Sequence, residues 1–233
     1  MIGRRSLLAF AATCLACRNT PERPKSPRTR HVAGLDVVEL FVHGADERSP
    51  LLVAIHGMGD RPERWIDTYA SFPRAAQVVL PRAFAPLGDG FSWFSLREGT
   101  TDAELGDAVG AAEARLWTGL DALAGGRKPV VTGFSQGGIL SFAIASRHAD
   151  AIVRAFPVSG SCPGPLLPQG KAAPVTAFHG TDDRVLDIKW GREAVHAFVE
   201  RGNDATLKEY AGVGHTITAE MRRDLWDAIV KVL

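Results

Sequence analysis

The chain has 233 residues, of which 45% are hydrophobic and 23% charged, and this indicates one globular domain with a sizeable core. Residues 1–30 carry seven Lys or Arg and one Glu, so the remaining 203 residues have a net charge of −5 within a total of +1. An acidic domain of this kind is a poor nucleic-acid binder. After residue 17 the chain has one cysteine, Cys162, which excludes an internal disulfide in the mature domain.

Residues 1–17 have the pattern of an export signal. Arg4 and Arg5 precede an apolar run over 7–16, which is about half the length that spans a bilayer. The alternative, a first core helix, is disfavoured by the prolines and charges that follow. The stretch "RRSLL" also resembles the twin-arginine pattern, so the general secretory and twin-arginine routes both stay open.

The stretch "TCLAC", residues 13–17, resembles the lipobox of bacterial lipoproteins. The resemblance implies a lipidated Cys17, with Cys14 or cleavage without a lipid as alternatives. Residues 18–34 are then a Pro-rich basic linker beside anionic headgroups, and the folded domain covers 35–233. We expect an exported lipoprotein that faces the periplasm or the cell exterior. Its oligomeric state is left open.

Apolar, β-branched runs alternate with helical patterns along the rest of the chain. The runs are mostly continuous, which is typical of strands buried on both faces; they are 37–43, 51–57, 77–81, 129–135, 151–160, 174–180 and 205–212. Helices are predicted over 102–124, 137–148, 189–201 and 218–232, the first opened by a Thr101–Glu104 capping box. This alternation predicts an α/β fold with a mostly parallel central sheet and helices on both faces.

The stretch "GFSQG" places Ser135 between a predicted strand and a predicted helix. That turn lies at the carboxyl edge of the sheet, where α/β proteins place their sites. A strand that reverses into a helix within one or two residues brings backbones into close approach, which explains Gly133 and Gly137. The alternative is an ordinary serine N-cap.

A nucleophilic serine needs a base, and the base needs a carboxylate to orient it. On such a sheet the acid and the histidine follow the serine in the chain. Asp182, Asp183 and Asp187 follow the strand at 174–180, and the residues alone do not rank the first two. His215, in the glycine-rich turn "GVGH", is the candidate base, with a surface loop histidine as the alternative.

The stretch "HGMGD", residues 56–60, follows the strand at 51–57. Its turn can bring a backbone N–H alongside the nucleophile, and the residue after Ser135 supplies a second N–H. Met58 and Gln136 are therefore predicted to form an oxyanion hole. His56 is interpreted as a structural residue of this turn.

The set "HGMGD", "GFSQGG", "HGTDD" and "GVGH", with "GFSWFSL" between them, resembles the phospholipase/carboxylesterase branch of the α/β-hydrolases, which includes acyl-protein thioesterases. The resemblance covers about residues 35–233 and implies a single-domain α/β-hydrolase fold. It also implies Ser135 as nucleophile, Asp183 as acid and His215 as base. The family usually has proline after that aspartate, and here the chain reads "RVLD".

The expected activity is that of a serine esterase, which cleaves carboxylic esters through an acyl-enzyme. A small-molecule ester is the expected partner, and no metal or organic cofactor is expected, since the chain has no Cys/His cluster with ligand spacing. The alternatives are a thioesterase or lysophospholipase, an acyltransferase or peptidase on the same scaffold, and a non-catalytic tethered binding module.

Aromatic residues gather in the stretch between 82 and 100. Phe84, Phe91, Trp93 and Phe94 lie there, and we expect them, Trp93 above all, to line an open acyl-binding groove rather than to cap the core. The chain has no insertion long enough for a helical lid. We therefore expect activity on soluble esters of short to medium acyl chains.

Overall fold

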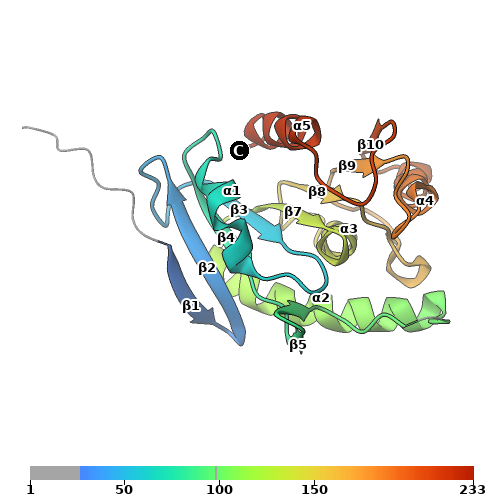
Figure 1. Ribbon diagram of the computed structural model, residues 1–233, viewed down its shortest axis with the longest axis horizontal. Helices are drawn as coiled ribbons and strands as arrows, with labels where there is room; N and C mark the ends of the chain where they lie inside the picture. The colour runs from blue at the N-terminus through green and yellow to red at the C-terminus, as the bar shows by residue number, and fades with distance from the viewer. Residues whose placement is uncertain (1–26, 98) are drawn as a thin grey trace, which may run out of the picture.

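The computed structural model describes residues 27–97 and 99–233 (Figure 1). The predicted export signal, Cys17 and the first part of the predicted linker lie outside these residues. Among the residues that are described, no helix is both long enough and apolar enough to cross a membrane.

An eight-stranded sheet, in the order β1-β2-β4-β3-β7-β8-β9-β10, forms the centre of the described domain. The first two pairings are antiparallel, and all the others, from β4 to β10, are parallel. The strands are β1 (Arg28–Val32), β2 (Leu35–Val42), β3 (Leu51–Ile55), β4 (Ala76–Pro81), β7 (Val130–Phe134), β8 (Arg154–Val158), β9 (Val175–Gly180) and β10 (Ala205–Tyr210). A separate hairpin is made of β5 (Ala85–Leu87) and β6 (Gly90–Ser92).

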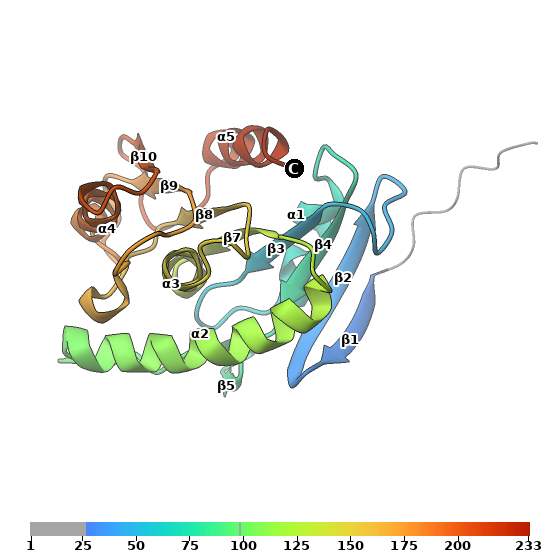
Figure 2. The same cartoon turned by 180° about the vertical axis from the view of Figure 1, so that it is seen from behind.

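Helices cover both faces of the sheet, as Figures 1 and 2 show from opposite sides. On one face, α2 (Asp102–Ala124), α3 (Gln136–Arg147) and α4 (Ile188–Glu200) pack into one apolar cluster. On the other, α1 (Ile66–Ala70) and α5 (Ala219–Val230) pack into a second cluster. Two short 3-10 helices, η1 (Pro62–Trp65) and η2 (Gly164–Leu166), complete the described elements. The predicted α/β-hydrolase architecture is confirmed.

The predicted strands and helices are present, with ends that differ from the prediction by one to three residues in most cases. The capping box on α2 is also present, since the Thr101 hydroxyl accepts from the Glu104 N–H and the Glu104 carboxylate accepts from the Thr101 N–H. The structure adds η1, α1, β5, β6 and η2. These elements are three to five residues long, too short for a periodic pattern to predict them.

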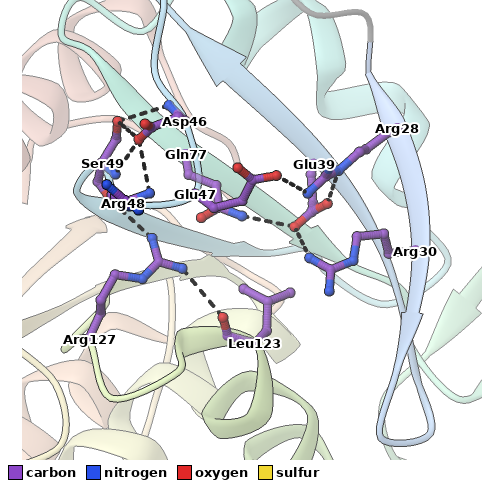
Figure 3. Close-up of polar contacts among 10 residues, drawn as sticks. All are labelled: Arg28, Arg30, Glu39, Asp46, Glu47, Arg48, Ser49, Gln77, Leu123 and Arg127. Carbon is purple, nitrogen blue, oxygen red and sulfur yellow. Dashed lines mark hydrogen bonds and ion pairs between the residues drawn. The ribbon is translucent and has the colours of Figure 1, made fainter.

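The interpretation of residues 28–32 as part of a linker is wrong. They form β1, which pairs with β2 through a two-residue turn at Ala33 and Gly34, both with positive φ. Arg28 and Arg30 hold the fully buried carboxylate of Glu39, with N–O distances of 2.5 and 3.0 Å (Figure 3). Only one face of β1 is partly covered, and its polar sequence hides the strand pattern.

Candidate active site

Ser135 lies in the turn between β7 and α3, at the carboxyl edge of the sheet. Its φ of 57° is in the left-handed region, which a non-glycine residue adopts only where the surroundings impose it. A Cβ at Gly133 would collide with the backbone of Gly137, and one at Gly137 with the carbonyl oxygen of Ile55. The predicted reason for both glycines, close backbone approach, is therefore confirmed.

His215 lies in the loop between β10 and α5 and faces Ser135. The serine side chain does not cap α3; its Oγ lies 2.9 Å from Nε2 of His215. Nδ1 of the same ring lies 2.7 Å from Oδ2 of Asp183. Because an ionised carboxylate can only accept, Nδ1 carries the proton and Nε2 is free to accept from the serine hydroxyl. The three predicted side chains thus form one hydrogen-bonded chain.

The structure separates the three candidate aspartates. Asp182 is exposed and accepts from the Thr181 hydroxyl, and Asp187 caps α4 by accepting from an N–H of its first turn. Asp183 alone is buried and reaches His215. The ring nitrogen Nε2 of His179 donates to the carbonyl of Leu186 and steadies the turn beyond Asp183.

Asp183 is held as a carboxylate. Burial opposes its ionisation, but the hydrogen bonds from His215 and from the backbone N–H groups of Leu186 and Val185 outweigh burial and lower the pKa of Asp183. Both N–H groups donate to Oδ1 at 2.9 Å, while Oδ2 faces His215. The turn after Asp183 therefore forms through its own carboxylate, without the proline that the family usually places there.

The loop at 56–60 packs directly against the nucleophile. A Cβ at Gly57 would lie 3.3 Å from the Cβ of Ser135. Within the described residues, the N–H groups of Met58 and Gln136 donate to no acceptor. An oxyanion hole requires free N–H donors beside the serine oxygen, and the assignment of Met58 and Gln136 to this role stays a prediction.

His56 holds this loop in place and does not face the nucleophile. Its Nε2 accepts from the Ala83 N–H at 3.2 Å, so Nδ1 carries the proton and donates to the carbonyl of Gly57. Burial lowers the pKa of His56 and keeps the ring neutral. These contacts agree with the structural interpretation of this residue.

The aromatic stretch does not form the expected open groove. Trp93 and Phe94 are 3% and 6% exposed and belong to the core cluster, and neither lines a described cavity. Phe91 is half-buried and packs against the same core, and the Arg82 guanidinium lies over its ring. The expectation that these rings line an acyl-binding groove is therefore wrong for Trp93 and Phe94, because their loop folds inward.

The same stretch instead supports the active site through hydrogen bonds to the loop at 56–60 and to Gln136. The Trp93 indole Nε1 donates to the carbonyl of His56 at 2.8 Å. The side-chain amide of Gln136 accepts from the Trp93 N–H and donates to the carbonyl of Phe94. The Gly59 N–H donates to the carbonyl of Phe91. The sequence does not predict this role, although "GFSWFSL" is part of the family resemblance. The reason is that the direction of a side chain in an irregular loop depends on tertiary contacts.

A cleft of about 320 Å³ opens beside His215, between α1 and α5. Its walls carry aromatic and aliphatic side chains, and its polar members include one aspartate and two arginines. The lining residues are Asp60, Arg64, Trp65, Thr68, Tyr69, Phe134, His215, Thr216, Ile217, Arg222, Leu225 and Trp226. No local sequence pattern predicts this cleft, because its two sides are about 150 residues apart in the chain.

No group of three or more His, Cys, Asp or Glu within residues 27–97 and 99–233 is arranged to hold a metal ion. The arrangement can remove a proton from Ser135 and hold the resulting imidazolium against a carboxylate.

A serine, an aspartate and a histidine, in this chain order on such a sheet, define an α/β-hydrolase. The chain belongs to the Phospholipase/Carboxylesterase family, whose model matches residues 38–233. The family and its relatives indicate a hydrolase that acts on esters.

Three similar proteins illustrate the relationship. Acyl-protein thioesterase 1 homolog 2 from Dictyostelium discoideum is 33% identical over 110 residues, which cover 45% of this chain and 50% of that protein. Esterase YpfH from Escherichia coli strain K12 is 27% identical over 177 residues, which cover 72% of this chain and 76% of the esterase. The crystal structure of esterase PE8 shares the fold with a TM-score of 0.74 at 22% identity, over 84% of this chain and 97% of that one.

Proposed function

We propose that this protein is a serine esterase in which Ser135 attacks an ester carbonyl and forms an acyl-enzyme. The observation that carries the proposal is the hydrogen-bonded chain from Asp183 through His215 to Ser135. His215 accepts the serine proton as the Oγ–carbon bond forms, and the N–H groups of Met58 and Gln136 bind the oxyanion. The alcohol leaves with the proton from His215, and water activated by His215 then releases the acid.

The experiment combines covalent labelling with turnover of phenyl acetate. A fluorophosphonate should label the wild-type protein at Ser135, identified by mass spectrometry of the modified peptide. Ser135→Ala should abolish both labelling and hydrolysis, whereas Ser161→Ala, a nearby half-buried serine on the loop after β8, should retain both. Wild-type turnover by Ser135→Ala would refute the proposal.

We propose soluble esters with short to medium acyl chains as substrates. The sequence supports this because no insertion is long enough for a helical lid, so the site needs no lipid surface to open. The test is a series of p-nitrophenyl esters of increasing acyl length beside an emulsified long-chain triglyceride. A rate that peaks on the emulsion would overturn this part.

Thioesters are a second substrate class, supported by the name of the Dictyostelium relative, an acyl-protein thioesterase homolog. The acyl-enzyme is the same for an oxygen ester and a thioester, and only the leaving group differs. Phenyl butyrate and its S-phenyl thioester, compared at equal concentration, separate the two classes by their kcat/KM values.

We also propose export and lipidation at Cys17, supported by the "TCLAC" pattern alone. The expected mature chain begins at an acylated Cys17 and partitions with membranes. Cys17→Ser should abolish the acyl mass and release the protein, whereas Cys14→Ser should do neither. A mature N-terminus without acyl mass would contradict this proposal.

A further inference from the structure

The cleft beside His215 carries a local excess of positive charge, whereas the domain as a whole is negatively charged. Its charged lining consists of Arg64, Arg222 and Asp60, although residues 31–233 carry a net charge of −5. A local excess of positive charge in an acidic domain indicates an anionic ligand.

The one carboxylate of the cleft is already engaged. Oδ2 of Asp60 accepts from the Trp65 indole at 2.7 Å, and Oδ1 accepts from the Arg61 N–H at 2.8 Å. Arg64 reaches the same Oδ1 only at 3.5 Å, and its side chain is half exposed. Most donors of the Arg64 guanidinium therefore remain available to a ligand.

Arg222 is held over an aromatic ring rather than by a carboxylate. Its guanidinium carbon lies 5.5 Å from the ring centroid of Trp226, and no described carboxylate pairs with it. Trp226, Trp65 and Phe134 supply flat apolar walls of the cleft that the two arginines and His215 also line. A planar or aliphatic body that ends in an anionic group matches this combination of surfaces.

The position of His215 indicates which part of an ester substrate lies in the cleft. Of the three side chains in the proposed triad, His215 is the one that lines it. In the first half-reaction this imidazole delivers its proton to the departing oxygen or sulfur, so the leaving group lies next to the ring.

We infer, resting on the proposed esterase function, that the cleft binds the leaving group and selects alcohols or thiols that carry an anionic group, a carboxylate or a phosphate. Arg64 and Arg222 contact the anion, and the aromatic walls contact the body that joins it to the scissile bond. Both arginines act on substrate choice and leave the order of bond making and breaking unchanged.

The test compares 4-acetoxybenzoate with its neutral methyl ester at the carboxyl group, methyl 4-acetoxybenzoate. The quantity compared is kcat/KM for 4-acetoxybenzoate divided by kcat/KM for its methyl ester. Arg64→Gln and Arg222→Gln should each lower this ratio about fivefold or more, since charge-assisted contacts are stronger than neutral ones. Arg223→Gln, an exposed neighbour on α5 that does not line the cleft, is the matched control and should leave the ratio unchanged. Rising salt should lower the wild-type ratio.

Two further substrates separate the sources of the anion and the sides of the ester. A preference for 4-acetoxyphenyl phosphate over 4-acetoxybenzoate identifies phosphate as the better anion, and the reverse identifies carboxylate; both support the inference. If the arginine variants instead change the ratio of phenyl hemisuccinate to phenyl butyrate, the cleft holds the acyl group and the inference is overturned. An unchanged ratio on every pair also overturns it.

Failure of the proposed function gives a different result. In that case wild-type protein hydrolyses neither phenyl acetate nor the neutral methyl ester, whatever the state of the arginines. Normal hydrolysis of the neutral esters with an unchanged charge ratio refutes the anionic cleft alone.

Discussion

Asp183 and Glu39 are both buried carboxylates, and their surroundings are opposite. Glu39 is paired with Arg28 and Arg30, two permanent cations, at the antiparallel edge of the sheet (Figure 3). Asp183 is paired with two backbone N–H groups and with His215, whose ring exchanges a proton with its surroundings. A carboxylate neutralised by permanent cations can only hold the fold together, whereas one beside an imidazole can respond to a change of charge.

The largest effect expected from this comparison is on catalysis at Asp183. Asp183→Asn should lower kcat/KM by about 10³–10⁴, because an amide at this position favours the wrong imidazole tautomer and cannot stabilise the imidazolium. Asp182→Asn is the matched control, since this neighbour is exposed and directed to Thr181. Steady-state kinetics on phenyl acetate measures both, and a larger loss from the Asp182 variant would reverse the assignment.

Glu39→Gln should show the opposite pattern, with a loss of stability and little loss of activity. Removing the charge weakens two contacts to arginine, and hydrogen bonds to charged groups contribute about 1.5–3 kcal/mol each to the free energy of unfolding. Urea denaturation measures the loss, and turnover of phenyl acetate should stay near the wild-type value. If Glu39→Gln instead lowered kcat markedly and left the free energy of unfolding unchanged, the contrast between a structural Glu39 and a catalytic Asp183 would be wrong.

A smaller effect is expected from an uncharged hydrogen bond at the site. Trp93→Phe removes the indole donor to the carbonyl of His56, and a neutral hydrogen bond contributes about 1 kcal/mol. We expect kcat to fall about fivefold with little change in KM, since the loop at 56–60 is positioned less well beside Ser135.

The control for this variant is Trp117→Phe on α2, where the indole stacks on His148. It should leave kcat unchanged. A rise in KM that grows with acyl length would instead restore the view that Trp93 contacts the acyl chain.

The smallest effect concerns the acid stability of the Asp183 pair. The pKa of Asp183 is lowered in the folded state, so its contribution is present above the unfolded value of about 3.9 and is lost as the pH falls through the folded value. The free energy of unfolding of the wild type should therefore fall relative to Asp183→Asn as the pH drops below about 5. A difference that stays constant from pH 7 to pH 3 would contradict the lowered pKa.

The sequence predicts the parallel part of this fold and the turn that holds Ser135, for one physical reason. Long apolar strands and a tight strand-to-helix turn impose local patterns, such as the flanking glycines of Ser135, that survive without knowledge of tertiary contacts. The polar strand β1, the short hairpin β5–β6 and the inward direction of Trp93 depend on what packs against them. Only the family resemblance distinguishes Asp183 from Asp182 in the sequence, whereas in the structure Asp183 alone has two backbone donors and the contact with His215.

The two-residue turn between β1 and β2 also sets how the domain bears load. Because Arg28 is opposite Glu39 and Val32 is opposite Leu35, a pull on the chain before residue 28 acts on one cross-strand pair at a time, from Arg28 toward the turn. For a pull directed across the strands this is peeling rather than shear, and the first pair to separate contains the buried Glu39. A force applied through an anchored N-terminus would thus first break the ion pairs of Glu39, while Ser135, on a strand in the middle of the sheet, would be reached late.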